Sequence, residues 1–128
     1  MAVKVIDASA LAAILFAEPG ADELVGVAGD ATLVAPALIE YEVGNTCWKK
    51  CQRHPQQAAA LRAAFKTMGE MRLQLHDVDA GSVLALAESA EITFYDASYL
   101  WLAEQLGVPL ISVDHNLLAA WRTHAAGA

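Results

Sequence analysis

The chain has 128 residues, of which 56% are hydrophobic and 18% are charged, and its formal net charge is −7. This composition excludes a disordered chain and predicts a single domain over residues 1–128 with a core of its own. The excess of acidic residues argues against a protein that coats nucleic acid by bulk charge, because phosphate binding comes from clustered lysine and arginine.

Strands and helices are expected to alternate along the chain. Runs of β-branched residues indicate strands, apolar residues at helical spacing indicate helices, and Gly and Pro separate them. Because the strands include nearly continuous apolar runs, the alternation predicts an α/β fold with a mainly parallel sheet. In chain order we expect a strand at 3–6, helices at 9–17 and 21–28, a strand at 32–35, helices at 38–51 and 55–68, a strand at 73–78, helices at 80–90 and 97–106, a strand at 108–113, and a last helix from 117.

The N-terminus carries a weak signal for export. Lys4 precedes an uncharged run at 8–17, as in a signal peptide. Asp7 interrupts that arrangement, and residues 3–6 read better as a strand. No segment has the length needed to cross a membrane. We therefore expect a cytoplasmic protein with no membrane partner.

The two cysteines, Cys47 and Cys51, lie four residues apart on one expected helix. Both would project to nearly the same side of that helix, where a disulfide is geometrically awkward. We expect reduced, partly buried thiols. The alternative is a partial metal site with His54, although a structural zinc site has four ligands and no fourth is evident.

Three aspartates fall where a parallel sheet places its ligand crevice. Asp7 follows the first strand, Asp114 follows the last strand, and Asp96 stands at the start of a helix. The crevice of an open parallel sheet lies at the carboxyl ends of its strands, so these side chains are expected at one edge. Each also has a structural alternative, because aspartate is a preferred helix cap and turn residue.

A fourth acid lies on the expected helix at 38–51. Asn45 is three residues after Glu42 and shares its face, whereas Glu40 must point elsewhere. An exposed helical glutamate is the alternative interpretation. As a set, however, crowded carboxylates repel one another unless a cation joins them, and Mg²⁺ binds through one or two carboxylates and water.

Six of the eight basic residues lie in a single 24-residue stretch. Such a cluster could hold a nucleic-acid backbone beside a metal pocket, or it could be a solvated helical face. The six are Lys49, Lys50, Arg53, Arg62, Lys66 and Arg72.

Three stretches together resemble the PIN-domain ribonucleases of the VapC toxin type. They are VIDASALAAIL, PALIEYEVGN and FYDASYLWLAEQLGVPLISVD, and they run in order nearly to residue 121. The last stretch is the most specific, because it joins an Asp-Ala-x-Tyr-Leu helix to Leu-Gly-x-Pro-Leu and a strand that ends in Asp. The resemblance implies a PIN-like three-layer sandwich with helices on both sides of the sheet.

The resemblance also implies a metal-binding site. Asp7 and Asp96, 89 positions apart, would be the principal Mg²⁺ ligands, with Mn²⁺ able to substitute, and Glu42 and Asp114 would complete the acidic set. Residues expected to support these ligands are Ser9, Asn45 and Ser112, where Ser112 stands at a position that is more often Thr in the family.

The function implied is that of a toxin in a toxin–antitoxin pair. It would be an endoribonuclease that hydrolyses RNA phosphodiester bonds through metal-activated water. A small cognate antitoxin would inhibit it, and the toxin would be a homodimer. Contacts with RNA or antitoxin are expected at the six basic residues and on the apolar helix that carries Leu11, Ile14, Leu15 and Phe16. Core packing is the alternative for that apolar helix and would account for most of it.

Two other functions fit parts of the pattern. A PIN module without catalysis would act only by binding a protein partner. A phosphoacceptor receiver domain has the same size and fold class, but it needs an acidic pair after its first strand and a late lysine. Here Asp7 stands alone and no lysine follows Lys66.

Overall fold

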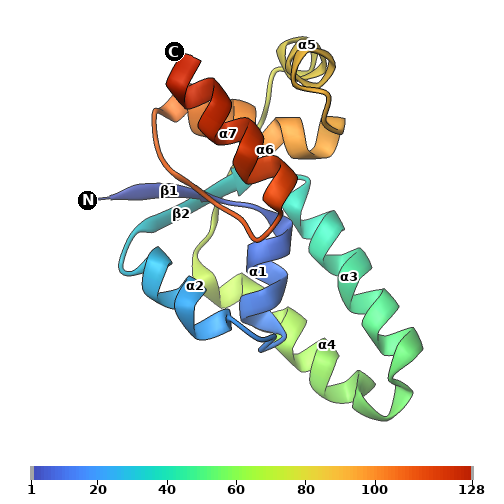
Figure 1. Cartoon of the computed structure of the whole chain (residues 1–128). Helices are drawn as coiled ribbons and strands as arrows, with labels where there is room; N and C mark the ends of the chain where they lie inside the picture. The colour runs from blue at the N-terminus through green and yellow to red at the C-terminus, as the bar shows by residue number, and fades with distance from the viewer. Residues whose placement is uncertain (1, 128) are drawn as a thin grey trace.

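The computed structural model describes residues 2–127, which form an α/β sandwich around one parallel sheet (Figure 1). Its strands stand in the order β3-β2-β1-β4, with β1 at Val3–Ile6, β2 at Thr32–Pro36, β3 at Gln74–His76 and β4 at Leu110–Ile111. Val5 of β1 pairs with Val34 on one side and with Leu110 on the other. Helices flank the sheet, so the expected three-layer α/β fold is confirmed.

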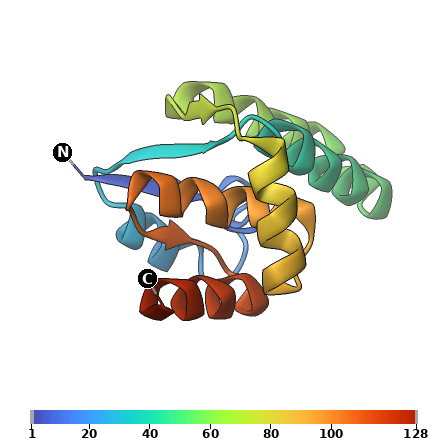
Figure 2. The same ribbon diagram turned by 90° about the horizontal axis from the view of Figure 1, so that it is seen from above.

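The helices divide between the two sides of the sheet. In Figure 1, α1 and α2 lie below β1 and β2, and α6 packs above them against β1, β2 and β4. Viewed from above, α6 runs between α7 and the α3–α4 pair (Figure 2). The helices are α1 (Ala8–Leu15), α2 (Ala21–Ala28), α3 (Ile39–Arg53), α4 (Ala58–Lys66), α5 (Ala80–Ala90), α6 (Phe94–Leu106) and α7 (His115–Gly127).

Side chains on the inner faces of these layers form the main core. Val5, Ile6, Leu100 and Leu117 are fully buried. Because β1 is covered on both faces, the consecutive residues Val5 and Ile6 at its carboxyl end are both buried, whereas Lys4 is only partly buried. The carboxyl end of β1 is thereby fixed beside the starts of the helices that follow.

Two strands are shorter than expected. The last one was expected at 108–113, but β4 ends at Ile111. Beyond it the amide of Val113 donates to Ser9 Oγ at 3.2 Å and the amide of Asp114 donates to Ser112 Oγ at 2.9 Å. Serine hydroxyl oxygens therefore accept from the backbone amides that would otherwise have continued the pairing of β4 with its neighbouring strand. Likewise, β3 covers only Gln74–His76 of the expected 73–78.

Helix boundaries also differ from the expectation where polar side chains cap them. The helix expected at 97–106 begins at Phe94, because Thr93 Oγ1 accepts from the amide of Asp96 at 3.1 Å. The last helix begins at His115 rather than 117, since Asp114 Oδ1 accepts from the amide of Leu117 at 3.0 Å. The helix expected at 55–68 is divided into a 3-10 turn at Pro55–Gln57, α4, and a second 3-10 turn at Thr67–Met71.

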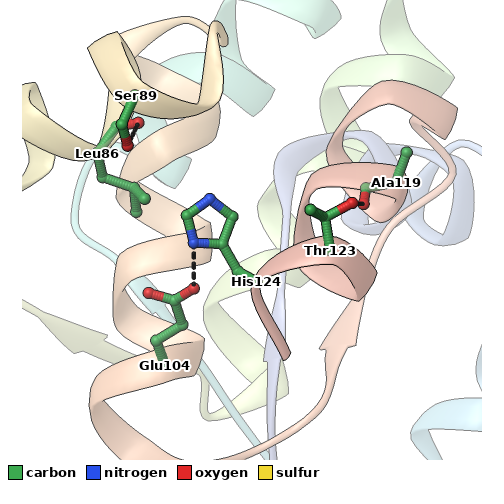
Figure 3. A network of polar contacts seen from close by, with 6 residues as sticks. All are labelled: Leu86, Ser89, Glu104, Ala119, Thr123 and His124. Carbon is green, nitrogen blue, oxygen red and sulfur yellow. Dashed lines mark hydrogen bonds and ion pairs between the residues drawn. The ribbon is translucent and has the colours of Figure 1, made fainter. Parts of the chain in front are cut away.

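The α3–α4 hairpin projects from the body of the fold (Figure 1). Cys47 and Cys51 are free thiols on its inner side, and their sulfurs lie 3.6 Å from the Leu61 carbonyl and 3.9 Å from the Ala58 carbonyl. The expectation of reduced thiols agrees with this arrangement. Helix α7 is joined to α6 by His124, whose Nδ1 lies 3.3 Å from Glu104 Oε1 (Figure 3).

None of the helices between residues 2 and 127 combines the length and the apolar character that crossing a membrane requires.

Candidate active site

Four carboxylates from four separate segments line one cleft of about 670 Å³. Asp7 follows β1, Glu42 lies in the first turn of α3, Asp96 in the first turn of α6, and Asp114 immediately precedes α7. Parallel pairing of β1 with β4 brings the first and last of these segments together. The structure thus gathers the whole predicted acidic set at the carboxyl edge of the sheet.

Asp7 is the most constrained of the four acids. Its side chain is only 3% exposed, and Oδ1 accepts from the amide of Ala10 at 2.9 Å, which caps α1. Ser112 Oγ donates to Oδ2 at 2.6 Å, and Ser9 Oγ lies 2.8 and 2.9 Å from the two oxygens. The capping role and the site role therefore coexist, and the hydroxyls fix the carboxylate in the cleft wall.

Glu42 is oriented by a residue of another helix. The Tyr99 hydroxyl donates to Glu42 Oε1 at 2.7 Å, and the ring of Tyr99 is 1% exposed in the core. Glu40, two residues earlier on α3, instead lines a different hollow together with Phe65 and Arg72. The opposite placement of the two glutamates agrees with the expected helical geometry.

Asp96 and Asp114 differ in their bonding. Asp114 Oδ1 caps α7, as the alternative interpretation allowed. Asp96 is not the cap of α6, because Thr93 has that role. Within residues 2–127, no hydrogen bond reaches the Asp96 carboxylate, and that side chain is about half-buried at the cleft. Asp96 therefore keeps its oxygens free for a ligand.

Burial and mutual repulsion raise the pKa of three of these carboxyl groups. Burial is the main cause at Asp7, where the nearby charge of Asp114 adds to it and bonds from Ser112, Ala10 and Ser9 oppose it. Burial also raises the pKa of Glu42 and of Asp96, and in each case neighbouring site carboxylates contribute. The cleft therefore concentrates negative charge that a cation would relieve.

The acidic side chains of the cleft offer carboxylate oxygens, which are the ligands that a hard cation such as Mg²⁺ prefers. No group of three or more His, Cys, Asp or Glu side chains between residues 2 and 127 is arranged to hold a metal ion. The alternative metal site at Cys47, Cys51 and His54 therefore has no support within these residues. A hydrated cation held by two carboxylates fits the arrangement, because Mg²⁺ retains several waters.

The residues expected to support the acids are placed unequally. Ser9 and Ser112 both contact Asp7, and their own hydroxyl oxygens lie 3.4 Å apart. Asn45 lines the cleft from α3 but is exposed. The two serines therefore contact Asp7 directly, whereas Asn45 contributes only to the lining of the cleft.

The six basic residues do not form one surface. Lys49 lines the acidic cleft. Lys50 forms an ion pair with Glu18 at 2.6 Å, and its ammonium lies 5.6 Å from the centre of the Phe16 ring. The other four are exposed on or just after the α3–α4 hairpin: Arg53, Arg62, Lys66 and Arg72.

The apolar contact surface expected on α1 is mostly part of the fold. Leu11 is fully buried in the main core, and Ile14, Leu15 and Phe16 are partly buried against it. Leu11 is therefore not available to a partner, which corrects that part of the expectation.

The structure adds residues that the pattern did not assign. Tyr99 belongs to the Asp-Ala-x-Tyr-Leu motif, yet only the folded chain shows that it contacts Glu42. Thr93 stands three residues before Asp96, which is a capping signal visible in the sequence. Tyr41 and Tyr95, each directly before a site carboxylate, also line the cleft.

Comparison with known families identifies the fold. The PIN domain profile matches residues 4–120 of the chain. The chain belongs to the PIN-domain family. The solved structure of PAE2754 from Pyrobaculum aerophilum resembles this PIN domain with a TM-score of 0.76 at 33% identity, over 94% of this chain and 87% of that one.

Relatives of this PIN-domain chain carry VapC names. It is 29% identical to Ribonuclease VapC3 of Pyrobaculum aerophilum over 88% of this chain and 90% of that protein. It is 30% identical to Ribonuclease VapC9 of Mycobacterium tuberculosis, over 88% and 87% of the two chains. Exonuclease VapC9 of Pyrobaculum aerophilum is 39% identical, but the match spans 62% of that protein, less than two thirds of it. The resemblance to VapC-type PIN domains is confirmed, and a receiver domain is excluded.

Proposed function

We propose that this PIN-domain chain is the toxin of a toxin–antitoxin pair and that it cleaves RNA internally in the presence of a divalent cation. The observation that carries the proposal is the convergence of Asp7, Glu42, Asp96 and Asp114 on one cleft. The names of its relatives, Ribonuclease VapC3 and Ribonuclease VapC9, support RNA as the substrate.

In this proposal each acid has its own task. Asp7 and Asp96 hold the cation, Mg²⁺ or Mn²⁺, because Asp7 is fixed by two hydroxyls and Asp96 is otherwise unbonded within residues 2–127. When bound, the cation supplies Lewis-acid activation of the scissile phosphate and of the attacking water. Glu42 and Asp114 orient that water, and Tyr99 keeps Glu42 in position.

A matched pair of variants on α3 tests the assignment. Full-length protein, freed of any antitoxin, is incubated with RNA and Mn²⁺. Glu42→Gln should lower the cleavage rate by about 100-fold or more, which is the usual size of a lost acid–base or orienting group. Glu40→Gln removes the same charge two residues away, outside the cleft, and should cleave at the wild-type rate. Equal rates for both variants would overturn the role of Glu42.

A circular RNA distinguishes internal cleavage from digestion at an end, a distinction raised by the relative named Exonuclease VapC9. An endoribonuclease converts the circle to a linear product, whereas an exonuclease leaves it intact. Wild-type protein that cleaves neither circular nor linear RNA would instead favour a PIN module that only binds a partner.

The antitoxin and the second subunit belong to the same proposal. A small antitoxin would cross the cleft and offset its negative charge with a basic side chain, and the exposed hairpin residues Arg53 and Arg62 are candidate contacts. Co-expression with the adjacently encoded protein should suppress cleavage. Light scattering of the purified toxin should give the mass of a homodimer.

A further inference from the structure

We propose that Tyr41 and Tyr95 are substrate-binding residues, on whose rings the nucleobases beside the scissile phosphate stack. This inference rests on the proposed function, because it takes RNA as the substrate of the acidic cleft. It adds the two residues that would position that RNA.

Both rings are exposed at the site of chemistry. Tyr41 is 81% exposed and Tyr95 is 60% exposed, and both line the cleft with the four carboxylates. They reach it from different helices, α3 and α6, and each directly precedes a site acid, Glu42 or Asp96. Fixing those acids in the cleft therefore also fixes the two rings at its border.

The fold itself makes little use of these rings. Tyr99, on the same helix as Tyr95, is 1% exposed and its hydroxyl is bonded to Glu42. In contrast, neither Tyr41 nor Tyr95 has a side-chain hydrogen bond in the part of the chain that the structure describes. Two large aromatic side chains held in solvent beside an active cleft indicate a binding role.

The charge of the cleft explains why bases must contribute to binding. The four candidate site carboxylates and a fifth, that of Glu18, line it against one basic residue, Lys49. RNA binding by phosphate neutralisation alone needs clustered lysine and arginine, which this cleft lacks. Stacking of an unpaired base on an aromatic ring is insensitive to that charge and tolerates any base. The tyrosines thus supply affinity where the acids oppose it.

A second hollow adjoins the cleft, and in this proposal the RNA strand continues into it. The hollow has a volume of about 830 Å³ and shares Asp96 with the acidic cleft. Small polar side chains line it, with Ser89 on α5 and Thr123 on α7 (Figure 3). Their hydroxyls donate to the carbonyls of Leu86 and Ala119 in their own helices. Their oxygens therefore remain as acceptors for base amino groups and ribose hydroxyls.

Kinetics with single variants test the proposal. Tyr41→Ala and Tyr95→Ala should each lower kcat/KM on single-stranded RNA by about tenfold, chiefly by raising KM, as expected for one lost stacking contact. Tyr41→Phe and Tyr95→Phe keep the ring and should recover most of the KM that the corresponding alanine variants lose. Trp48→Ala is the matched control, because Trp48 is 58% exposed on α3 but does not line the cleft.

An abasic substrate separates stacking from a structural effect. RNA that lacks the base beside the cleaved bond should be a poorer substrate for the wild type, and one alanine variant should show no further loss on it. Two results would overturn the inference: alanine variants with wild-type KM on intact RNA, or the same tenfold loss on intact and abasic RNA. Wild-type protein that cleaves no RNA would overturn the proposed function instead.

Discussion

The Tyr99 hydroxyl donates to Glu42 Oε1 across 2.7 Å and so joins α6 to α3 inside the PIN fold. The phenol is buried, and burial together with the adjacent carboxylate raises its pKa above the ordinary value. Tyr99 therefore stays protonated and remains a donor throughout the physiological range. It is a positioning residue, because it acts on the chemistry through Glu42.

Removal of that donor should affect stability and the pH dependence of cleavage together. The bond from Tyr99 lowers the pKa of Glu42 against the effect of burial, so Tyr99→Phe should raise that pKa further. The acid limb of the pH–rate profile should then move to higher pH, and the free energy of unfolding should fall by about 1–2 kcal/mol. Tyr95→Phe, on the same helix but exposed, should change neither. An unshifted acid limb in Tyr99→Phe would contradict the role given to Glu42.

Asp96→Asn should stabilise the metal-free protein at neutral pH. The folded-state pKa of Asp96 is raised by burial and by the charges of Asp114 and Asp7. A carboxyl group with a raised pKa contributes stability that is present below its unfolded pKa and lost as the pH rises through its folded pKa. Because the side chain is half-exposed and solvent screens it, the gain at pH 7 should be only about 0.5 kcal/mol.

The measurement is urea unfolding with chelator at two pH values. The gain in Asp96→Asn should be present near neutral pH and absent below the ordinary aspartate pKa of 3.8. Asp30→Asn, which removes a charge from an exposed position, is the control. A gain that does not change with pH would rule out charge repulsion as its cause.

Divalent cations should stabilise the fold weakly. A ligand that binds only the folded cleft raises the melting temperature by an amount that grows with the logarithm of its concentration relative to its dissociation constant. Because a cation held by two carboxylates keeps most of its water ligands, we expect affinity in the millimolar range, and several-millimolar Mn²⁺ should raise the melting temperature by a few degrees. Asp7→Asn and Asp96→Asn should lose this response. Tight, micromolar binding in a titration calorimeter would show that the acids rearrange into a closed site.

Ser112→Ala should destabilise the chain more than other serine replacements. Its hydroxyl donates to buried Asp7 at 2.6 Å, and this bond lowers the pKa of Asp7 against burial. Without the bond, the buried carboxylate loses a donor, at a cost of about 1–3 kcal/mol at neutral pH. Ser89→Ala, whose hydroxyl donates to a carbonyl of its own exposed helix turn, should cost little (Figure 3). Thermal unfolding of both variants at neutral pH measures the difference, and Ser112→Thr should recover the stability if the hydroxyl is what matters.

Much of the fold could be predicted from local patterns. The strand at Val3–Ile6 and the helices at Ala21–Ala28 and Ala80–Ala90 have the predicted bounds, because turn residues and caps mark their ends in the sequence. The apolar run at 108–113 predicted too long a strand, because an apolar run does not show that serine hydroxyls accept from the amides of Val113 and Asp114. A contact between distant segments, from Val113 to Ser9, therefore sets one missed boundary, whereas local caps at Thr93 and Asp114 set the missed starts of α6 and α7.

The candidate site was likewise predicted in part from the sequence. The order of strands and acids placed Asp7 and Asp114 at one sheet edge, and the motif order indicated a VapC-type PIN domain before any geometry was known. The 24-residue stretch with six basic residues was expected to offer one face, but Lys50 is paired with Glu18 while Lys49 lines the cleft. Consecutive residues of a helix point in different directions, so basic residues that are neighbours in the sequence need not share one surface.

The sequence by itself determined the α/β class, the position of the first strand and the order of the four candidate acids along the chain, because periodicity and residue chemistry are local properties. Only the tertiary structure decided which groups surround those acids. Ser112 reaches Asp7 across 105 positions and Tyr99 reaches Glu42 across 57, through parallel strand pairing and helix packing. Such contacts depend on burial and register shared by several elements, so they exist only once the whole chain has folded.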